Sequence, residues 1–159
     1  MISGYTDFEI KGEGLASIVE KYKDVGRVLV GVPKGAGAYE DGTLIAVIAA
    51  VNEFGSADGR IPERAPLRIG VQAAEGELSA LAEQSIPKIN AGEMDVNDLL
   101  DQMGFLAVGK IQEKISEGLS PANAESTIKR KGSSTPLVDQ GTFKQSITHV
   151  ISAEDSVDD

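Results

Sequence analysis

The stretch from Leu44 to Phe54, LIAVIAAVNEF, constrains the fold of this chain more than any other. Read as a helix, it is apolar on nearly every face up to Val51, and such a helix needs cover on most sides. We therefore expect it at the centre of the core, with Thr43 as its N-cap and Gly55 as its end. The run of eight apolar residues is far short of the roughly 20 that span a bilayer, so no membrane segment is expected.

The composition of the chain excludes several kinds of chemistry and several classes of binding partner. The 159 residues include no cysteine, which excludes disulfides, thiolate metal sites and cysteine nucleophiles. A formal net charge of −10 predicts repulsion from nucleic acid and from anionic membranes. Residues 120–152 form a basic island between an acidic body and an acidic tail, so patches of opposite sign could meet between subunits. The N-terminus has no signal-peptide pattern, and we expect a product of a reducing cytoplasm.

Hydrophobic periodicity predicts the remaining elements. Strands are predicted over 5–10, 27–32 and 147–151. Helices are predicted over 15–22, 68–84, 96–116 and 121–130, with one further turn after Gly141. Pro87 is expected to break the second of these helices, and Asp95 to cap the third. Strands near the ends and helices in the middle favour an α+β fold, with a small mixed or antiparallel sheet packed against several helices. One domain is expected over 1–152, followed by an acidic tail over 153–159.

The segment Pro33–Thr43 contains three glycines and mixed charges, and we predict a flexible loop or the tip of a long hairpin. The run Gly31–Gly37 resembles a phosphate-binding loop only superficially. Its second glycine would fall on Ala36, and no Lys-Ser or Lys-Thr pair follows. A small cytoplasmic nucleotide-binding enzyme using this loop is therefore a remote alternative. The residues of this loop that could dock a partner are Lys34, Gly35, Gly37 and Tyr39.

Nothing else in the chain predicts catalysis. His149 is the only histidine, and no nucleophile or orienting carboxylate stands near it in sequence, so it fits a strand face. Asp95, Asp98 and Asp101 lie at the start of a predicted helix, where acidic side chains complement the helix dipole. We therefore predict a protein that is not an enzyme and has no catalytic residues, no cofactor and no metal.

Two stretches favour a docking function. The first is Asn52-Glu-Phe-Gly-Ser followed by the segment 59–68, GRIPERAPLR. Extended segments that are stiffened by proline and carry regularly placed arginines dock well, because they lose little conformational entropy on binding. The alternative is that this segment is an ordinary solvated connection. The second runs from Leu119 to Ile147 and contains the basic cluster 129–131, a Pro-Leu-Val anchor and a turn at Asp-Gln-Gly. Here the alternatives are a solvated loop and a nucleic-acid loop, for which an aromatic platform is missing.

Together these motifs resemble the tail-completion proteins of long-tailed bacteriophages, also called tail terminators, tail-to-head joining proteins or virion morphogenesis proteins. The resemblance extends from about Phe8 to Ile151. It implies an α+β fold and a ring, commonly hexameric, that caps the finished tail and joins it to the head-side connector. It implies no catalysis. A head-completion protein or a minor capsid protein is the alternative within the same class.

The resemblance also implies partners and contact surfaces. The partners would be further copies in a ring, the tail tube, the sheath and the head-side connector, with genomic DNA only passing through. The protein would belong to the neck of a virion assembled in the cytoplasm of a host bacterium. The interface candidates are Glu53, Phe54, Arg60, Pro62, Arg64, Pro66, Arg68, Lys129, Arg130, Lys131, Pro136, Leu137, Asp139 and Gly141.

Overall fold

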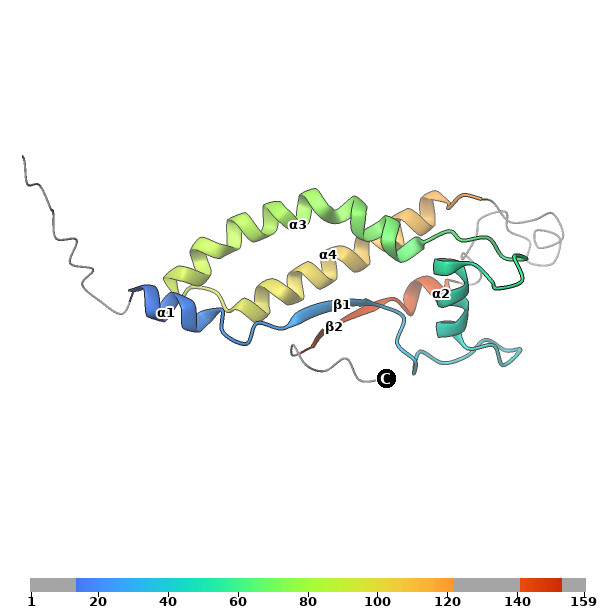
Figure 1. Cartoon of the computed structure of the whole chain (residues 1–159), viewed down its shortest axis with the longest axis horizontal. Coiled ribbons are helices and arrows are strands. Elements are labelled where there is room, and N and C mark those ends of the chain that lie inside the picture. The colour runs from blue at the N-terminus through green and yellow to red at the C-terminus, as the bar shows by residue number, and fades with distance from the viewer. Residues whose placement is uncertain (1–13, 122–140, 153–159) are drawn as a thin grey trace, which may run out of the picture.

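The computed structural model describes residues 14–121 and 141–152 (Figure 1). The elements in chain order are α1 Gly14–Lys21, β1 Arg27–Gly31, α2 Ile45–Phe54, α3 Pro66–Ala91, α4 Val96–Glu117, α6 Thr142–Gln145 and β2 Thr148–Ser152. This arrangement confirms the α+β fold class. The strand predicted over 5–10, the helix predicted over 121–130 beyond its first residue, and the acidic tail lie outside the described residues.

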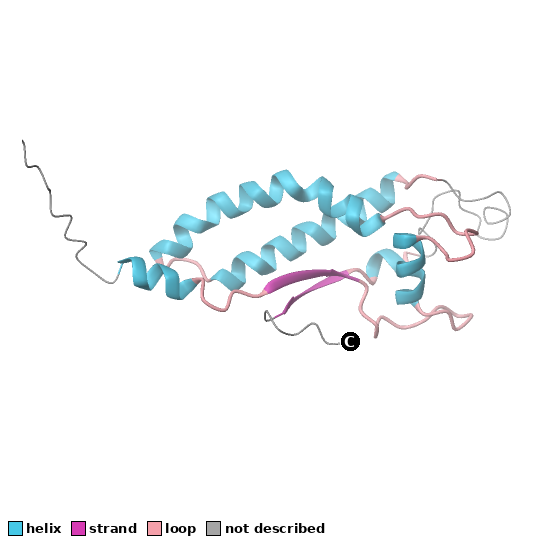
Figure 2. Cartoon of the chain, viewed as in Figure 1, coloured by secondary structure: helices cyan, strands magenta, loops and turns pink. Residues whose placement is uncertain are grey.

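The long helices α3 and α4 run side by side as a hairpin, and the two strands lie along α4 (Figures 1 and 2). The strands pair antiparallel, with Leu29 opposite Val150 and Val30 opposite His149. Because side chains alternate between the faces of a strand, Val30 and His149 share the face toward α4. Leu29 and Val150 lie on the opposite face and are exposed.

The core lies where α2, the C-terminal half of α4 and α6 meet. Its buried residues are Ile45, Ala49, Ile111, Ile115, Leu119, Phe143 and Ile147. Phe143 is fully buried although it belongs to a helix of one turn, so it anchors α6 to the end of α4. The core therefore sits at one end of the α3–α4 hairpin, and the rest of the hairpin extends beyond it (Figure 1).

Helix α2 lies at this end of the hairpin, and the prediction that it is covered on most sides is wrong. Ile45 and Ala49 are buried in the core, but Val47 is half exposed and Phe54 is 77% exposed. The N-cap position belongs to Leu44, and no side chain caps the helix there, so the predicted role of Thr43 is also wrong. One apolar face of α2 is thus left uncovered by the described part of the chain.

Helix α3 continues through Pro87 to Ala91, so the predicted break is wrong. Proline removes one backbone donor, but Pro87 is on an exposed side of the helix, where water can satisfy the carbonyl four residues earlier. The helix ends at Gly92, whose φ of 77° is left-handed. The amino group of Lys21 in α1 then donates to the last carbonyls of α3, that of Ile89 at 2.9 Å among them.

Helix α4 begins as predicted. The carboxylate of Asp95 accepts from the backbone N–H of Asn97 at 2.7 Å, and that of Asp98 accepts from the N–H of Asp95 at 3.3 Å. This reciprocal capping satisfies backbone donors that the first turn of a helix leaves free. Asp101 has a different partner, because its Oδ1 lies 2.8 Å from Nε2 of His149.

The absence of a side chain at Gly104 allows β2 to pack closely on α4. A Cβ built at Gly104 would lie 2.1 Å from Cδ2 of His149. The ring of Phe105 lies edge-on to the same imidazole, with 4.7 Å between the ring centroids, and Asp101 is hydrogen-bonded to the imidazole. The imidazole therefore has little room to move away. We expect Gly104→Ala to lower the free energy of unfolding by about 2 kcal/mol, measured by urea denaturation.

Replacing the imidazole at the same time is the control for that prediction. Gly104→Ala should lower the stability less in a His149→Ser background than in the parent chain, because the clash no longer exists there. Equal stability of Gly104→Ala and the parent chain would contradict the close packing of β2 on α4.

Candidate functional site at the junction of α2 and α3

Polar side chains are buried at the end of α2. The spacing that places Ile45 and Ala49 in the core also places Asn52 and Glu53 on the buried face of the helix. Their exposed fractions are 7% and 8%. Buried polar groups need hydrogen-bond partners, and the segment before α3 supplies them.

Arg64 provides one set of these partners. Its side chain is 6% exposed, Nη1 donates to Oδ1 of Asn52 at 3.0 Å, and Nε donates to the carbonyl oxygen of Pro121 at 2.9 Å. The backbone N–H of Arg64 also donates to the carbonyl of Asn52, at 2.8 Å. Burial lowers the pKa of the guanidinium, which nevertheless stays charged at any pH at which proteins fold. Arg64 thus joins α2, the approach to α3 and the end of α4.

Glu53 provides the N-terminal cap of α3 from a distant part of the chain. Its two carboxylate oxygens accept from the backbone N–H groups of Leu67 at 2.9 Å and Arg68 at 3.2 Å. The N-cap position itself is held by Ala65, which has a left-handed φ of 47° and no side-chain acceptor. The carboxylate lies at the N-terminal, positive end of this 26-residue helix. It accepts hydrogen bonds from two free N–H groups of the first turn, and its negative charge interacts favourably with the helix dipole.

Removing the charge of Glu53 tests this capping role. Glu53→Gln keeps one oxygen acceptor but loses the charge, so we expect the free energy of unfolding to fall by about 1 kcal/mol. The matched control is Glu63→Gln, because Glu63 pairs with Arg68 at the exposed surface and should contribute at most about 0.5 kcal/mol. Thermal and urea unfolding measure both variants, and equal losses would contradict the cap.

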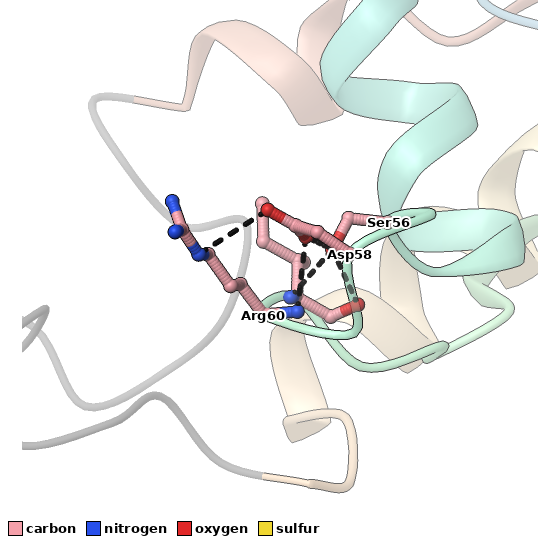
Figure 3. Close-up of polar contacts among 4 residues, drawn as sticks. Ser56, Asp58 and Arg60 are labelled. Carbon is pink, nitrogen blue, oxygen red and sulfur yellow. Dashed lines mark hydrogen bonds and ion pairs between the residues drawn. The ribbon is translucent and has the colours of Figure 1, made fainter.

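Between these buried contacts the chain makes a compact exposed loop from Ser56 to Ile61 (Figure 3). The backbone N–H of Ser56 donates to the carbonyl of Ile61 at 2.9 Å, and the N–H of Ile61 donates to Oγ of Ser56 at 2.8 Å. Asp58 accepts from Oγ of Ser56 at 2.6 Å and from the N–H of Arg60 at 3.1 Å. These hydrogen bonds, that from Ser56 foremost, lower the pKa of the Asp58 carboxyl. The loop is therefore preorganised although it is exposed.

The side chain of Arg60 extends away from this loop into solvent (Figure 3). It is 85% exposed, and within the described part of the chain its Nε forms an ion pair with Oδ2 of Asp58 at 3.3 Å. Phe54 precedes the loop and is the most exposed of the large apolar residues described. The junction thus presents an aromatic ring and a guanidinium on a fixed backbone.

The structure divides the predicted contact residues of this stretch into two groups. Phe54, Arg60, Pro62 and Arg68 are exposed, as a contact surface requires. Glu53, Arg64 and Pro66 are buried within the chain, so the exposed role expected for them is corrected to an internal one. The reason is that the carboxylate and the guanidinium satisfy backbone and amide groups of neighbouring elements.

The second predicted stretch is described only at its end. Gly141, with a φ of 72°, is half-buried at the start of α6. The other candidates lie outside the described residues: Lys129, Arg130, Lys131, Pro136, Leu137 and Asp139.

The segment 33–44 folds back on itself with an antiparallel bridge between Ala38 and Leu44, as in the tip of a short hairpin, and it does not extend β1, which pairs with β2. The N–H of Tyr39 donates to the carbonyl of Thr43 at 2.9 Å, and the half-buried Tyr39 packs against the core. Lys34, Gly35 and Gly37 are exposed. Three of the four docking candidates in this loop therefore face solvent, and the tyrosine holds the loop to the core.

Sequence reasoning missed Asn52 as a member of this site. Its amide donates to the carbonyl of Ile48 at 2.9 Å and accepts from Arg64 at 3.0 Å, so both ends of the side chain are used inside the protein. The signal was present in the spacing, because Ile45, Ala49 and Asn52 fall on one helix face. Extending the apolar face past Val51 would have identified the amide as buried.

Comparison with known proteins returns no match: no family model fits the chain, and no curated protein or solved structure is similar enough to count as a relative. Within the described ranges, no three acidic or histidine side chains gather where they could hold a metal ion. None of the helices in those same ranges combines the length and the apolar character that crossing a membrane requires.

Proposed function

We propose that this chain is a structural neck protein of a long-tailed phage, a tail-completion ring that caps the tail and joins it to the head-side connector. The observation that carries the proposal is the pair of motifs in their order along the chain, with Asn-Glu-Phe-Gly and Ile-Pro-Glu-Arg-Ala-Pro-Leu-Arg followed by the stretch from Leu119 to Ile147. The two halves of the first motif meet at the junction of α2 and α3, where Asn52 binds Arg64 and Glu53 caps α3. This first motif therefore acts as one structural unit.

The unit has the properties of a docking element. Its buried half holds the backbone, and its exposed half presents Phe54 and Arg60, residue types that dominate the energetics of protein interfaces. A preorganised backbone lowers the entropy lost on binding. The single chain also leaves Val47, Leu29 and Val150 exposed, and exposed apolar faces of this kind mark surfaces that assembly covers.

The charge of the chain fits a ring around a DNA channel. A net charge of −10 repels the phosphate backbone, so DNA would pass without binding. Specific nucleic-acid binding requires the opposite balance, with lysines and arginines in excess on one face.

Binding of the purified chain to isolated tail tubes and to isolated portal rings tests the proposal. We expect sedimentation with tail tubes and rings at tube ends in negative-stain images. Phe54→Ser should reduce binding at least about tenfold, because it removes an exposed aromatic anchor without touching the core. The matched control is Val19→Ser, which also replaces an exposed apolar side chain by serine but lies on α1. Binding to portal rings alone would favour a head-completion protein and contradict the proposal.

A further inference from the structure

A groove between α3 and α4 offers a receiving surface on the same chain. Its volume is about 330 Å³, and its apolar lining comes from Val71, Leu78, Ala82 and Met103. One acidic side chain, Glu75, also lines it. Apolar pockets accept aromatic groups readily, and a cavity of about 150 Å³ already holds a benzene ring. The groove is thus large enough for a phenylalanine side chain and more.

The groove lies in an acidic part of the chain, and the tip of the α2–α3 junction presents a guanidinium. Residues 69–109, which include the groove, contain seven acidic side chains and a single basic one, Lys88. The exposed charges of the junction balance, since Arg60 pairs with Asp58 and Arg68 with Glu63, so the guanidinium of Arg60 at the tip is the charge that can pair with the groove. Among the described residues, the guanidinium of Arg60 at the exposed tip is held by a surface ion pair, and such a pair contributes little and is exchanged easily.

We propose that a second copy of this chain seats its α2–α3 junction in the α3–α4 groove, with Phe54 against the apolar lining and Arg60 beside Glu75. This inference rests on the proposed function and specifies the contact between neighbouring subunits of the ring. The shapes and the charges agree: an exposed ring and a guanidinium on one surface meet an apolar groove with a carboxylate on the other.

The two surfaces are different parts of one chain, so the contact is heterologous. Each copy offers its junction to one neighbour and its groove to another, and a contact of this kind closes into a ring when the rotation between copies allows it. The acidic groove also repels acidic surfaces of a neighbouring copy. Charge therefore contributes to the specificity of the contact as well as to its affinity.

Thiol crosslinking tests the contact directly, because the chain has no cysteine of its own. The two single variants Arg60→Cys and Glu75→Cys are purified, mixed and treated with a short bifunctional thiol crosslinker, because an arginine–carboxylate pair holds its Cα atoms farther apart than the about 7 Å that a direct disulfide allows. We expect a crosslinked dimer that contains one copy of each variant, since each has only one thiol. The control mixture pairs Glu75→Cys with Thr148→Cys, which places the thiol on the exposed β2 strand and should give no such dimer.

Charge exchange supplies a second readout. Arg60→Glu and Glu75→Arg should each weaken self-association about tenfold, and the double variant should recover most of it, because the pair is restored with the opposite orientation. Added salt should weaken the self-association of the parent chain, because it screens the charge pair. The contribution of the apolar contact of Phe54 should remain.

Each outcome has a distinct meaning. Assemblies that bind tails but give no crosslink between positions 60 and 75, or that trap the Thr148→Cys control instead, would overturn this contact and leave the proposed function standing. The expected crosslink in a protein that does not bind tails would support the contact and contradict the proposed function. A chain that stays monomeric, gives no crosslink and does not associate with tails would overturn both.

Discussion

Replacing Gly70 by alanine should lower the free energy of unfolding by about 3 kcal/mol, a large share of the stability of a domain of this size. Helices α3 and α4 approach each other closely at this glycine. A Cβ at Gly70 would lie 2.5 Å from Cα and 2.4 Å from Cγ1 of Ile111, a residue that is fully buried in the core. Backbone cannot move aside as a side-chain tip can, so the helices would have to separate. Urea denaturation followed by helical circular dichroism measures the loss.

Gly76 provides the matched control in the same helix. Nothing lies within 4 Å of a Cβ built there, so alanine should stabilise the protein by about 0.5–1 kcal/mol through helix propensity alone. Opposite signs for these two glycines are the expected result. A Gly70→Ala variant that is as stable as Gly76→Ala would contradict the packing of α3 on α4.

Truncating Arg64 should have the second large effect. Arg64→Ala leaves the buried Oδ1 of Asn52 without its donor and removes the link to the carbonyl of the exposed Pro121. We expect the free energy of unfolding to fall by about 3 kcal/mol. The free energy of unfolding of Arg64→Lys should lie between those of the parent chain and Arg64→Ala. An ammonium group lacks the fixed fork of a guanidinium and cannot reach both acceptors. Denaturation of the three proteins under one set of conditions gives the comparison.

The control for this loss is Arg68→Ala. Arg68 is exposed and pairs with Glu63 at the surface, so its removal should change stability by no more than about 0.5 kcal/mol. If the two arginines contributed equally, Arg64 would not be the buried link between α2 and α4 that the geometry describes.

The elements that the sequence predicts well are those with local signals. Helix α4 has an aspartate cap, a periodic apolar face and a terminal glycine, and its predicted bounds agree with the structure to about one residue. The strand predicted over 27–32 is observed at 27–31 and the strand predicted over 147–151 is observed at 148–152, but the pairing of these two strands was not predicted. Pairing with residues 148–152 depends on contacts between opposite ends of the chain, which no local pattern encodes.

The position of α2 was predicted incorrectly for an instructive reason. An apolar helix needs cover, but the pattern does not say whether the cover comes from the same chain. The described residues cover one face and leave Val47 and Phe54 exposed. Assembly with a second copy would restore the cover that the sequence demands.

The motif located the candidate site, but it did not predict which of its residues are exposed and which are buried. Spacing alone does not distinguish an arginine that docks a partner from one that closes an internal network. Arg60 and Arg64 stand four residues apart in the same irregular segment, and one is exposed while the other is buried. Only the path of the backbone after Gly55 decides which of them turns inward.

The mass of the purified chain in solution, measured by light scattering with and without tail tubes, tests the central claim most directly. A ring of six copies of the 16.7 kDa chain would have a mass of about 100 kDa, and we predict that species either free or at the ends of tubes. A chain that remains at 16.7 kDa at every concentration and never associates with tails would contradict the account.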